Sequence, residues 1–72
     1  METGYITGWN EQRGFGFIRW DGHRDVFCHI TAIHGNWMPC KDDRVMFDVS
    51  EDDLGRLRAT NVILVPYSGE EL

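Results

Sequence analysis

The residues in this chain best suited to chemistry are aromatic rings at alternate positions of a short, glycine-containing stretch. If residues 13–20 form a β-strand, Phe15 and Phe17 lie on one face with Arg19, and Ile18 lies on the other. Glycines within such a strand let a flat ring or a second backbone approach closely. Phenylalanines flanked by arginines are unsuited to a core or to a solvated face. They are well suited to stacking nucleic-acid bases.

A second alternating stretch, residues 25–30, turns Phe27 and His29 to one side and Cys28 to the other. If the two stretches pair antiparallel, Phe15, Phe17, Phe27 and His29 form one contiguous aromatic surface. Stacking one base on an aromatic ring contributes about 1–3 kcal/mol, so a few rings are enough for measurable binding. The alternative is that some of these phenylalanines belong to the core.

Alternation and turn residues predict the elements that hold these rings in place. Five short strands are expected, over residues 4–10, 13–20, 25–30, 45–49 and 56–65. A single helical turn is expected at 31–33, and an acidic hairpin loop at 51–55, whose carboxylates are expected to be solvated. Strands at hairpin spacing without a helix-length periodic segment indicate an all-β barrel or sandwich.

Composition limits the chain to one small domain. With 72 residues, 42% of them hydrophobic and 26% charged, it suits a globular fold. We expect the domain to cover residues 1–66 and residues 67–72 to form a flexible tail. Two unpaired cysteines, without a signal peptide or membrane-spanning run, predict free thiols and an intracellular location.

The formal net charge of −5 argues against an unspecific binder of polyanions, but the charges are unevenly distributed. Acidic residues cluster at Asp42, Asp43, Asp48, Glu51, Asp52 and Asp53. Arginines lie in the aromatic first third and near the end, at Arg13, Arg19, Arg24, Arg56 and Arg58. A basic, aromatic face on an acidic body is therefore expected.

On these motifs the chain resembles the cold-shock domain family. Residues 14–18 look like the first ribonucleoprotein motif of that family and residues 25–30 like the second, and the resemblance extends over residues 4–65. It implies a five-stranded antiparallel OB-fold barrel that binds single-stranded RNA or DNA with low sequence selectivity. It also implies that Phe15, Phe17, Phe27 and His29 stack on bases. An RNA-chaperone or gene-regulatory role in the cytoplasm would follow. The RNA-recognition fold uses similar motifs in the opposite order and needs helices, so it is disfavoured.

The chain departs from the family on its first strand. Gly8 stands where an exposed tryptophan is usual, so either Trp9 substitutes for that ring or the site is shorter at that end. Ile30 replaces an aromatic residue and contacts a base less well than a ring does. In the following loop Trp37 or Met38 can supply a further side chain, and we favour Trp37 because its ring can lie on a base.

The usual lysines near the first strand are also missing, and arginines take their place. Arg56 and Arg58 either contact the nucleic acid or form a solvated hairpin face that balances the acidic loop. With few phosphate contacts, the salt dependence of binding is expected to be small. The expected binding residues are Trp9, Arg13, Phe15, Phe17, Arg19, Phe27, His29, Ile30, Trp37, Arg56 and Arg58.

Zinc binding and catalysis are disfavoured. Cys28 and His29 are adjacent on a strand and face opposite ways, and the other histidines and Cys40 lack metal-ligand spacing. No nucleophile–base pair has a sequence context, so we expect no enzyme, no cofactor and no small-molecule substrate. The rival interpretation is a protein-interaction module with weak nucleic-acid affinity, or the amino-terminal domain of a longer protein, with a membrane protein as one case. We expect a monomer without direct membrane contact by this segment.

Overall fold

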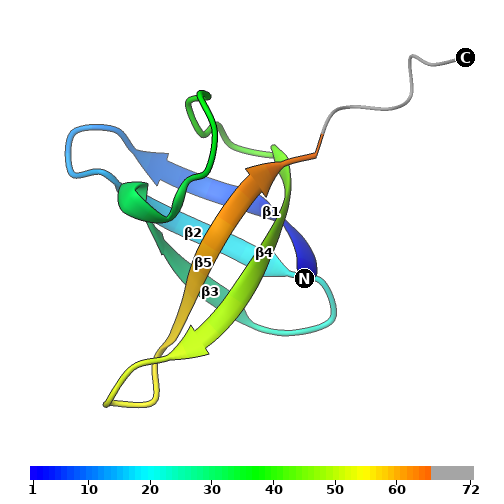
Figure 1. Cartoon of the computed structure of the whole chain (residues 1–72), viewed down its shortest axis with the longest axis vertical. Coiled ribbons are helices and arrows are strands. Elements are labelled where there is room, and N and C mark those ends of the chain that lie inside the picture. Colours follow the sequence, from blue (N-terminus) through cyan, green and yellow to red (C-terminus); the bar gives the residue numbers. More distant parts are fainter. Residues whose placement is uncertain (66–72) are drawn as a thin grey trace, which may run out of the picture.

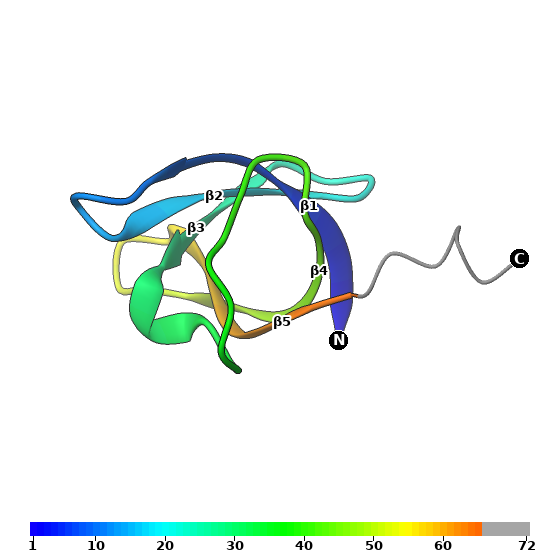
Figure 2. The same cartoon turned by 90° about the horizontal axis from the view of Figure 1, so that it is seen from above.

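The computed structural model describes residues 1–65 and shows an all-β fold (Figure 1). The strands are β1 (Glu2–Asn10), β2 (Phe15–Trp20), β3 (Asp25–His29), β4 (Arg44–Glu51) and β5 (Leu57–Leu64), and a 3-10 turn, η1 (Ile30–Ala32), follows β3. The strands close into a barrel in the order β1-β2-β3-β5-β4, as the end view in Figure 2 shows. The prediction of a five-stranded OB-type barrel is confirmed. The tail predicted for residues 67–72 lies outside the described residues.

All strand pairs are antiparallel except the one that closes the barrel. There β3 meets β5 in parallel, with Phe27 opposite Arg58. A short parallel contact of this kind lets the β4–β5 hairpin lie beside β3 without a further strand. Closure leaves no open sheet edge along most of the barrel, which protects a small β-domain from pairing with other chains.

Alternation along the strands builds the core. Its buried members are Ile6, Ile18, Val26, Cys28, Val45, Phe47, Ala59 and Val62. Cys28 is therefore a small core residue, as expected, and burial raises the pKa of its thiol to about 12. The thiol stays protonated and apolar at neutral pH.

The turn between β1 and β2 needs a glycine at its end. Gly14 has a φ of 74°, a left-handed conformation that residues with a side chain rarely adopt. Its N–H donates to the carbonyl of Asn10 over 2.8 Å, and the Asn10 side chain accepts from the N–H of Arg13 over 3.0 Å. This turn starts β2 at Phe15 rather than at Arg13, so Arg13 lies in the turn and not on the strand.

The short helical turn begins one residue earlier than expected. His29 accepts the N–H of Thr31 at its Nδ1 over 3.2 Å, and this cap ends β3 at His29 and starts η1 at Ile30. The segment from η1 to β4 then passes over one end of the barrel (Figures 1 and 2).

The acidic hairpin between β4 and β5 is held together by one carboxylate, Asp52. It accepts the backbone N–H groups of Leu54 and Arg56, each over 2.9 Å, and the Nε–H of Arg56 over 2.8 Å. These bonds, led by the one from the Arg56 backbone, hold the pKa of Asp52 below its ordinary value. The expectation that the acids of this turn are simply solvated is wrong for Asp52, whose side chain is only 17% exposed.

Candidate nucleic-acid interface

The two motif strands bring four predicted side chains to one face of the barrel. In the β2–β3 register Phe17 lies opposite Phe27, and Phe15 lies opposite His29. The ring centroids of Phe15 and Phe27 are 5.6 Å apart, and those of Phe17 and Phe27 are 5.9 Å apart in an edge-to-face arrangement. We call Phe15, Phe17, Phe27 and His29 the aromatic platform. Phe27 stands at its centre because it contacts both other phenylalanine rings.

The platform is open to solvent although its residues are large and apolar. Phe17 is 43% exposed, and the other members are half-buried, whereas Gly16, Ile18, Val26 and Cys28 on the opposite face are buried. Leaving such rings in water forgoes the favourable free energy of burying them, so a contiguous exposed group of them is a candidate binding surface. The alternative that these phenylalanines belong to the core does not match their exposure.

His29 adds a polar edge to this surface. Its Nδ1 accepts from the Thr31 backbone and lies 2.9 Å from the Thr31 hydroxyl. A neutral ring that accepts at Nδ1 carries its proton on Nε2. The Nε2–H is therefore left without a partner among residues 1–65, and the ring face remains accessible beside it.

Ile30 continues the surface beyond His29. It is 38% exposed, and its N–H donates to the Gly14 carbonyl over 2.8 Å. Its Cγ2 would lie 3.2 Å from a Cβ at Gly14, so the side chain packs directly beside the glycine that precedes Phe15. Ile30 is thus an exposed apolar side chain at one end of the platform.

Trp9 is not brought to the platform. A β-bulge between Ile6 and Gly8 pairs Gly8 with Phe17 and Trp9 with Gly16. A Cβ on Gly16 would lie 2.5 Å from Trp9 Cε3, so the indole covers the core-facing side of β2, where it packs against the core. Gly8 takes the outward position instead, and a Cβ there would meet nothing within 4 Å. Of the two possibilities left open for this strand, the structure favours a platform that is shorter at its β1 end.

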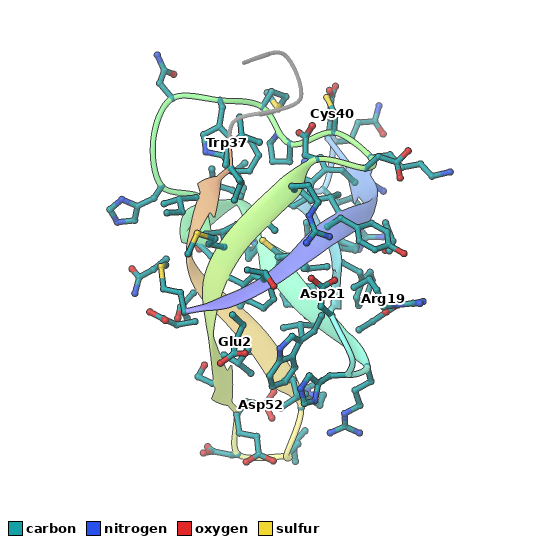
Figure 3. The ribbon with its side chains drawn as sticks, turned by 90° about the vertical axis from the view of Figure 1, so that its right-hand side faces the viewer. Glu2, Arg19, Asp21, Trp37, Cys40 and Asp52 are labelled. Atoms are coloured by element: carbon teal, nitrogen blue, oxygen red, sulfur yellow. The ribbon has the colours of Figure 1, made fainter. Side chains whose placement is uncertain are left out.

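Trp37 lies in the loop that passes over the barrel end, where Figure 3 labels it together with Cys40. Its Nε1–H donates to the His34 carbonyl over 2.7 Å, and the ring packs against the core. Its neighbour Met38 is 58% exposed. Between the two residues considered for this loop, Met38 has the more accessible side chain, while Trp37 presents a half-buried ring.

The predicted arginines fall into two groups. The guanidinium carbon of Arg13 lies 5.8 Å from the centroid of Phe15, and that of Arg58 lies 5.4 Å from the centroid of Phe27. Arg19 and Arg56 are bound instead to Asp25 and Asp52, respectively. The bond to Asp25 raises the pKa of Arg19. Hence Arg13 and Arg58 are the predicted cations that flank platform rings without a carboxylate partner among residues 1–65.

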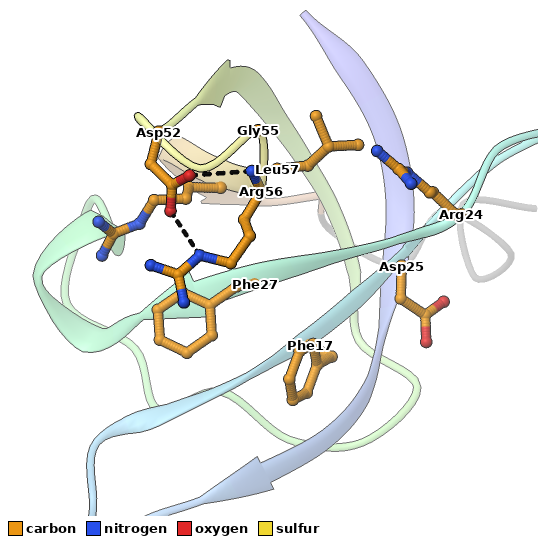
Figure 4. A pocket seen from close by; sticks show the side chains of 9 residues that line it. Phe17, Arg24, Asp25, Phe27, Asp52, Gly55, Arg56 and Leu57 are labelled. Atoms are coloured by element: carbon orange, nitrogen blue, oxygen red, sulfur yellow. Dashed lines mark hydrogen bonds and ion pairs between the residues drawn. The ribbon is translucent and has the colours of Figure 1, made fainter.

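A hollow of about 600 Å³ opens beside the platform, where β3 begins (Figure 4). Phe17, Phe27 and Leu57 supply its apolar lining, and Arg24 and Asp25 contribute from the start of β3. Arg24 was not among the binding residues expected from the sequence. It lies in a turn without periodicity, where no pattern shows which way a side chain points. Its closeness to the β4–β5 hairpin depends on barrel closure.

Comparison with known proteins agrees with this geometry. Residues 2–65 match the family model described as the 'Cold-shock' DNA-binding domain. The chain belongs to the cold-shock domain family. This confirms the resemblance, and members of the family bind single-stranded nucleic acids.

Relatives of this cold-shock domain match it over nearly their whole length. Cold shock protein CspD of Bacillus subtilis is 37% identical over 65 residues, which cover 88% of this chain and 97% of CspD. Cold shock-like protein CspLB of Listeria monocytogenes is 39% identical over 57 residues, covering 76% and 86% of the two chains. Among solved structures, drosophila Unr CSD456 matches with a TM-score of 0.77 at 28% identity, over 94% of this chain and 28% of that one.

Other kinds of site find no support in residues 1–65. No three histidine, cysteine or acidic side chains in this range gather in a way that could hold a metal ion. Among the same residues, no helix is long and apolar enough to cross a membrane. Cys40 is an exposed thiol in the loop over the barrel end, whereas Cys28 is buried.

Proposed function

We propose that this cold-shock domain binds single-stranded RNA or DNA on the aromatic platform, with low sequence selectivity and as a monomer. The observation that carries the proposal is the contiguous exposure of Phe15, Phe17 and Phe27 beside His29. Each ring face can stack on any base, so binding does not require a particular sequence. Arg13 and Arg58 add positive charge at the rims, where they can meet phosphates or stack on bases.

Bases stacked on the platform are not available for pairing. Binding therefore shifts the equilibrium between paired and unpaired strands without ATP or a cofactor. This effect supports an RNA-chaperone or gene-regulatory role, which we place in the cytoplasm on the strength of the family. A hairpin carrying a fluorophore and a quencher tests it: stoichiometric protein should lower the melting temperature of the stem.

The binding experiment is a fluorescence-anisotropy titration of a labelled heptathymidylate. Intrinsic tryptophan quenching is a poor readout, because Trp9 and Trp37 pack against the core and neither lies on the platform. The Phe15→Ala/Phe27→Ala variant removes two stacking rings, each contributing about 1–3 kcal/mol, so affinity should fall by about 30-fold or more. Ile63→Ala is the matched control, since Ile63 is a partly exposed apolar residue on β5.

The rival function is a protein-interaction module built on the same barrel. Two observations favour it: the outward position opposite Phe17 is occupied by Gly8, and Arg19 and Arg56 are bound to carboxylates. If the wild-type protein leaves the anisotropy unchanged at high micromolar concentration, this rival stands and the nucleic-acid proposal is wrong.

A further inference from the structure

The hollow beside the platform, where β3 begins, combines aromatic rings with hydrogen-bond donors and acceptors that have no partner among residues 1–65. Phe17 and Phe27 line it on the platform side, and the β4–β5 hairpin forms the facing wall (Figure 4). Its polar groups come from two places far apart in the sequence, the start of β3 and the acidic hairpin with the first residues of β5. The hollow can therefore hold a flat ring whose edge is read by polar side chains.

Two of these polar groups form hydrogen bonds within the protein. Asp52 accepts three hydrogen bonds from its own hairpin, and the Nε–H of Arg56 donates one of them. The Asp52 carboxylate is therefore part of the wall, whereas the four Nη–H groups of Arg56 donate to no residue in the range 1–65.

Three other groups still have hydrogen-bonding capacity. Among residues 1–65, the guanidinium groups of Arg24 and Arg58 form no ion pair and donate no hydrogen bond; Arg58 is held over the Phe27 ring. Asp25 accepts from Arg19 through Oδ1, and its Oδ2 accepts from no residue in that range. Besides the Nη groups of Arg56, the hollow therefore offers ten unengaged N–H donors on Arg24 and Arg58 and one carboxylate oxygen, in the same lining as Phe17 and Phe27.

We propose that this hollow receives a guanine base of the bound strand, so that the domain prefers guanine at one position of an otherwise unspecific site. Guanine presents two adjacent acceptors, O6 and N7, which suit a guanidinium, and the N1–H and N2 amino donors, which suit a carboxylate. In this arrangement Arg24 donates to O6 and N7 while Arg58 stays over the Phe27 ring, and Asp25 accepts from the donor edge.

Other occupants match the hollow less well. Adenine would turn its N6 amino group towards the arginines, and donor would face donor. Pyrimidines offer a smaller ring for stacking. A phosphate would be attracted by Arg24 and Arg58, but it has no donor for the unpaired Oδ2 of Asp25 and would bring a second negative charge close to it. The proposal rests on the proposed function, since the base arrives as part of a strand on the platform.

The test is a set of labelled heptathymidylates in which a single guanine occupies each position in turn. Guanine at one position, or at two adjacent ones, should tighten binding by about tenfold relative to the all-thymine strand, as expected for a bidentate contact. At that position 7-deazaguanine should lose most of the gain, because it lacks N7. Equal affinities across the series would overturn the inference while leaving the proposed function intact. Absence of binding by every strand would overturn both.

Protein variants assign the preference to the hollow. Arg24→Gln should reduce affinity for the best guanine strand by severalfold more than affinity for heptathymidylate. Lys41→Gln, which removes the same charge from the loop over the barrel end, should affect the two strands equally. If Arg24→Gln also weakens both equally, the arginine contacts phosphate and the guanine assignment is wrong. Both side chains are exposed, so neither change should unfold the domain.

Discussion

Gly8 offers the clearest way to perturb the platform by addition rather than removal. It lies opposite Phe17 in the β1–β2 register, and a Cβ built on it would meet nothing within 4 Å. Its φ is not among the left-handed values of this chain, so a side chain is tolerated by the backbone. The substitution Gly8→Trp should therefore place an indole beside Phe17, on the platform face.

Two effects are expected from Gly8→Trp. A further stacking ring should strengthen binding of heptathymidylate by about 1–3 kcal/mol, or about 5- to 150-fold. Replacing a strand glycine stabilises by about 0.5–1 kcal/mol, and a cross-strand aromatic pair adds about 0.2–1 kcal/mol. Together they should raise the melting temperature by several degrees, since about 1 kcal/mol corresponds to about 4–8 °C in a domain of this size.

Anisotropy titration and thermal unfolding followed by circular dichroism measure these two effects. Gly8→Ala is the control, because it removes the glycine without adding a ring. It should share part of the stability gain and none of the affinity gain. Should Gly8→Trp bind no tighter than Gly8→Ala, position 8 does not face the strand, and the description of β1 around its bulge is wrong.

Three further predictions concern salt, acid and thiols. With few arginines unpaired at the platform, the slope of log K against log salt should lie between about −1 and −2, at about −0.7 per phosphate neutralised; a steeper slope would indicate contacts beyond these. The pKa of Asp21 is lowered by its hydrogen bond from Arg44 and then from Thr3, and that of Asp52 by its hairpin bonds, so both folded values lie below 3.8. The stability that these carboxylates contribute is therefore present above pH 3.8 and is lost as pH falls through their lower folded pKa values. The measurement is the free energy of unfolding as a function of pH, followed by tryptophan fluorescence. In Asp52→Asn this free energy should fall less steeply with decreasing pH than in the wild type. Under native conditions Ellman's reagent should modify Cys40 alone, and after unfolding both thiols, because the buried Cys28 thiol has a pKa of about 12; two reactive thiols in the native protein would contradict the described core.

The platform was predictable from the sequence because β2 and β3 are regular and adjacent. Alternation assigned Phe15, Phe17, Phe27 and His29 to one face on the condition that the two strands pair antiparallel, and the β2–β3 register meets that condition. Local periodicity and one hairpin were enough, and no knowledge of the remaining strands was needed.

The departures occur where periodicity is interrupted. The bulge in β1 adds a residue to one strand of the pair, and this places Gly8 outward and Trp9 against Gly16. Nothing in the residue types of β1 marks that extra residue. The loop residues Trp37 and Met38 have no period at all, so the sequence could not indicate which of them packs inward.

Contacts made by barrel closure were also beyond reach of the sequence. Arg24 and Arg58 are far apart along the chain, and they line one hollow only because β3 pairs with β5. Asp52 is similar on a smaller scale, since three hydrogen bonds to one carboxylate depend on the exact path of the hairpin backbone. Residue types indicated charge in both places, and the fold determined which charges remain available.

Mapping the residues that a bound single strand contacts tests the proposed function most directly. In a ¹H–¹⁵N and aromatic ¹H–¹³C NMR titration with heptathymidylate, the largest shift changes should fall on Phe15, Phe17, Phe27 and His29. Met46 and Ile63, which pair between β4 and β5, should stay unchanged. Shift changes centred on Met46 and Ile63, with the platform resonances unmoved at saturation, would contradict the account.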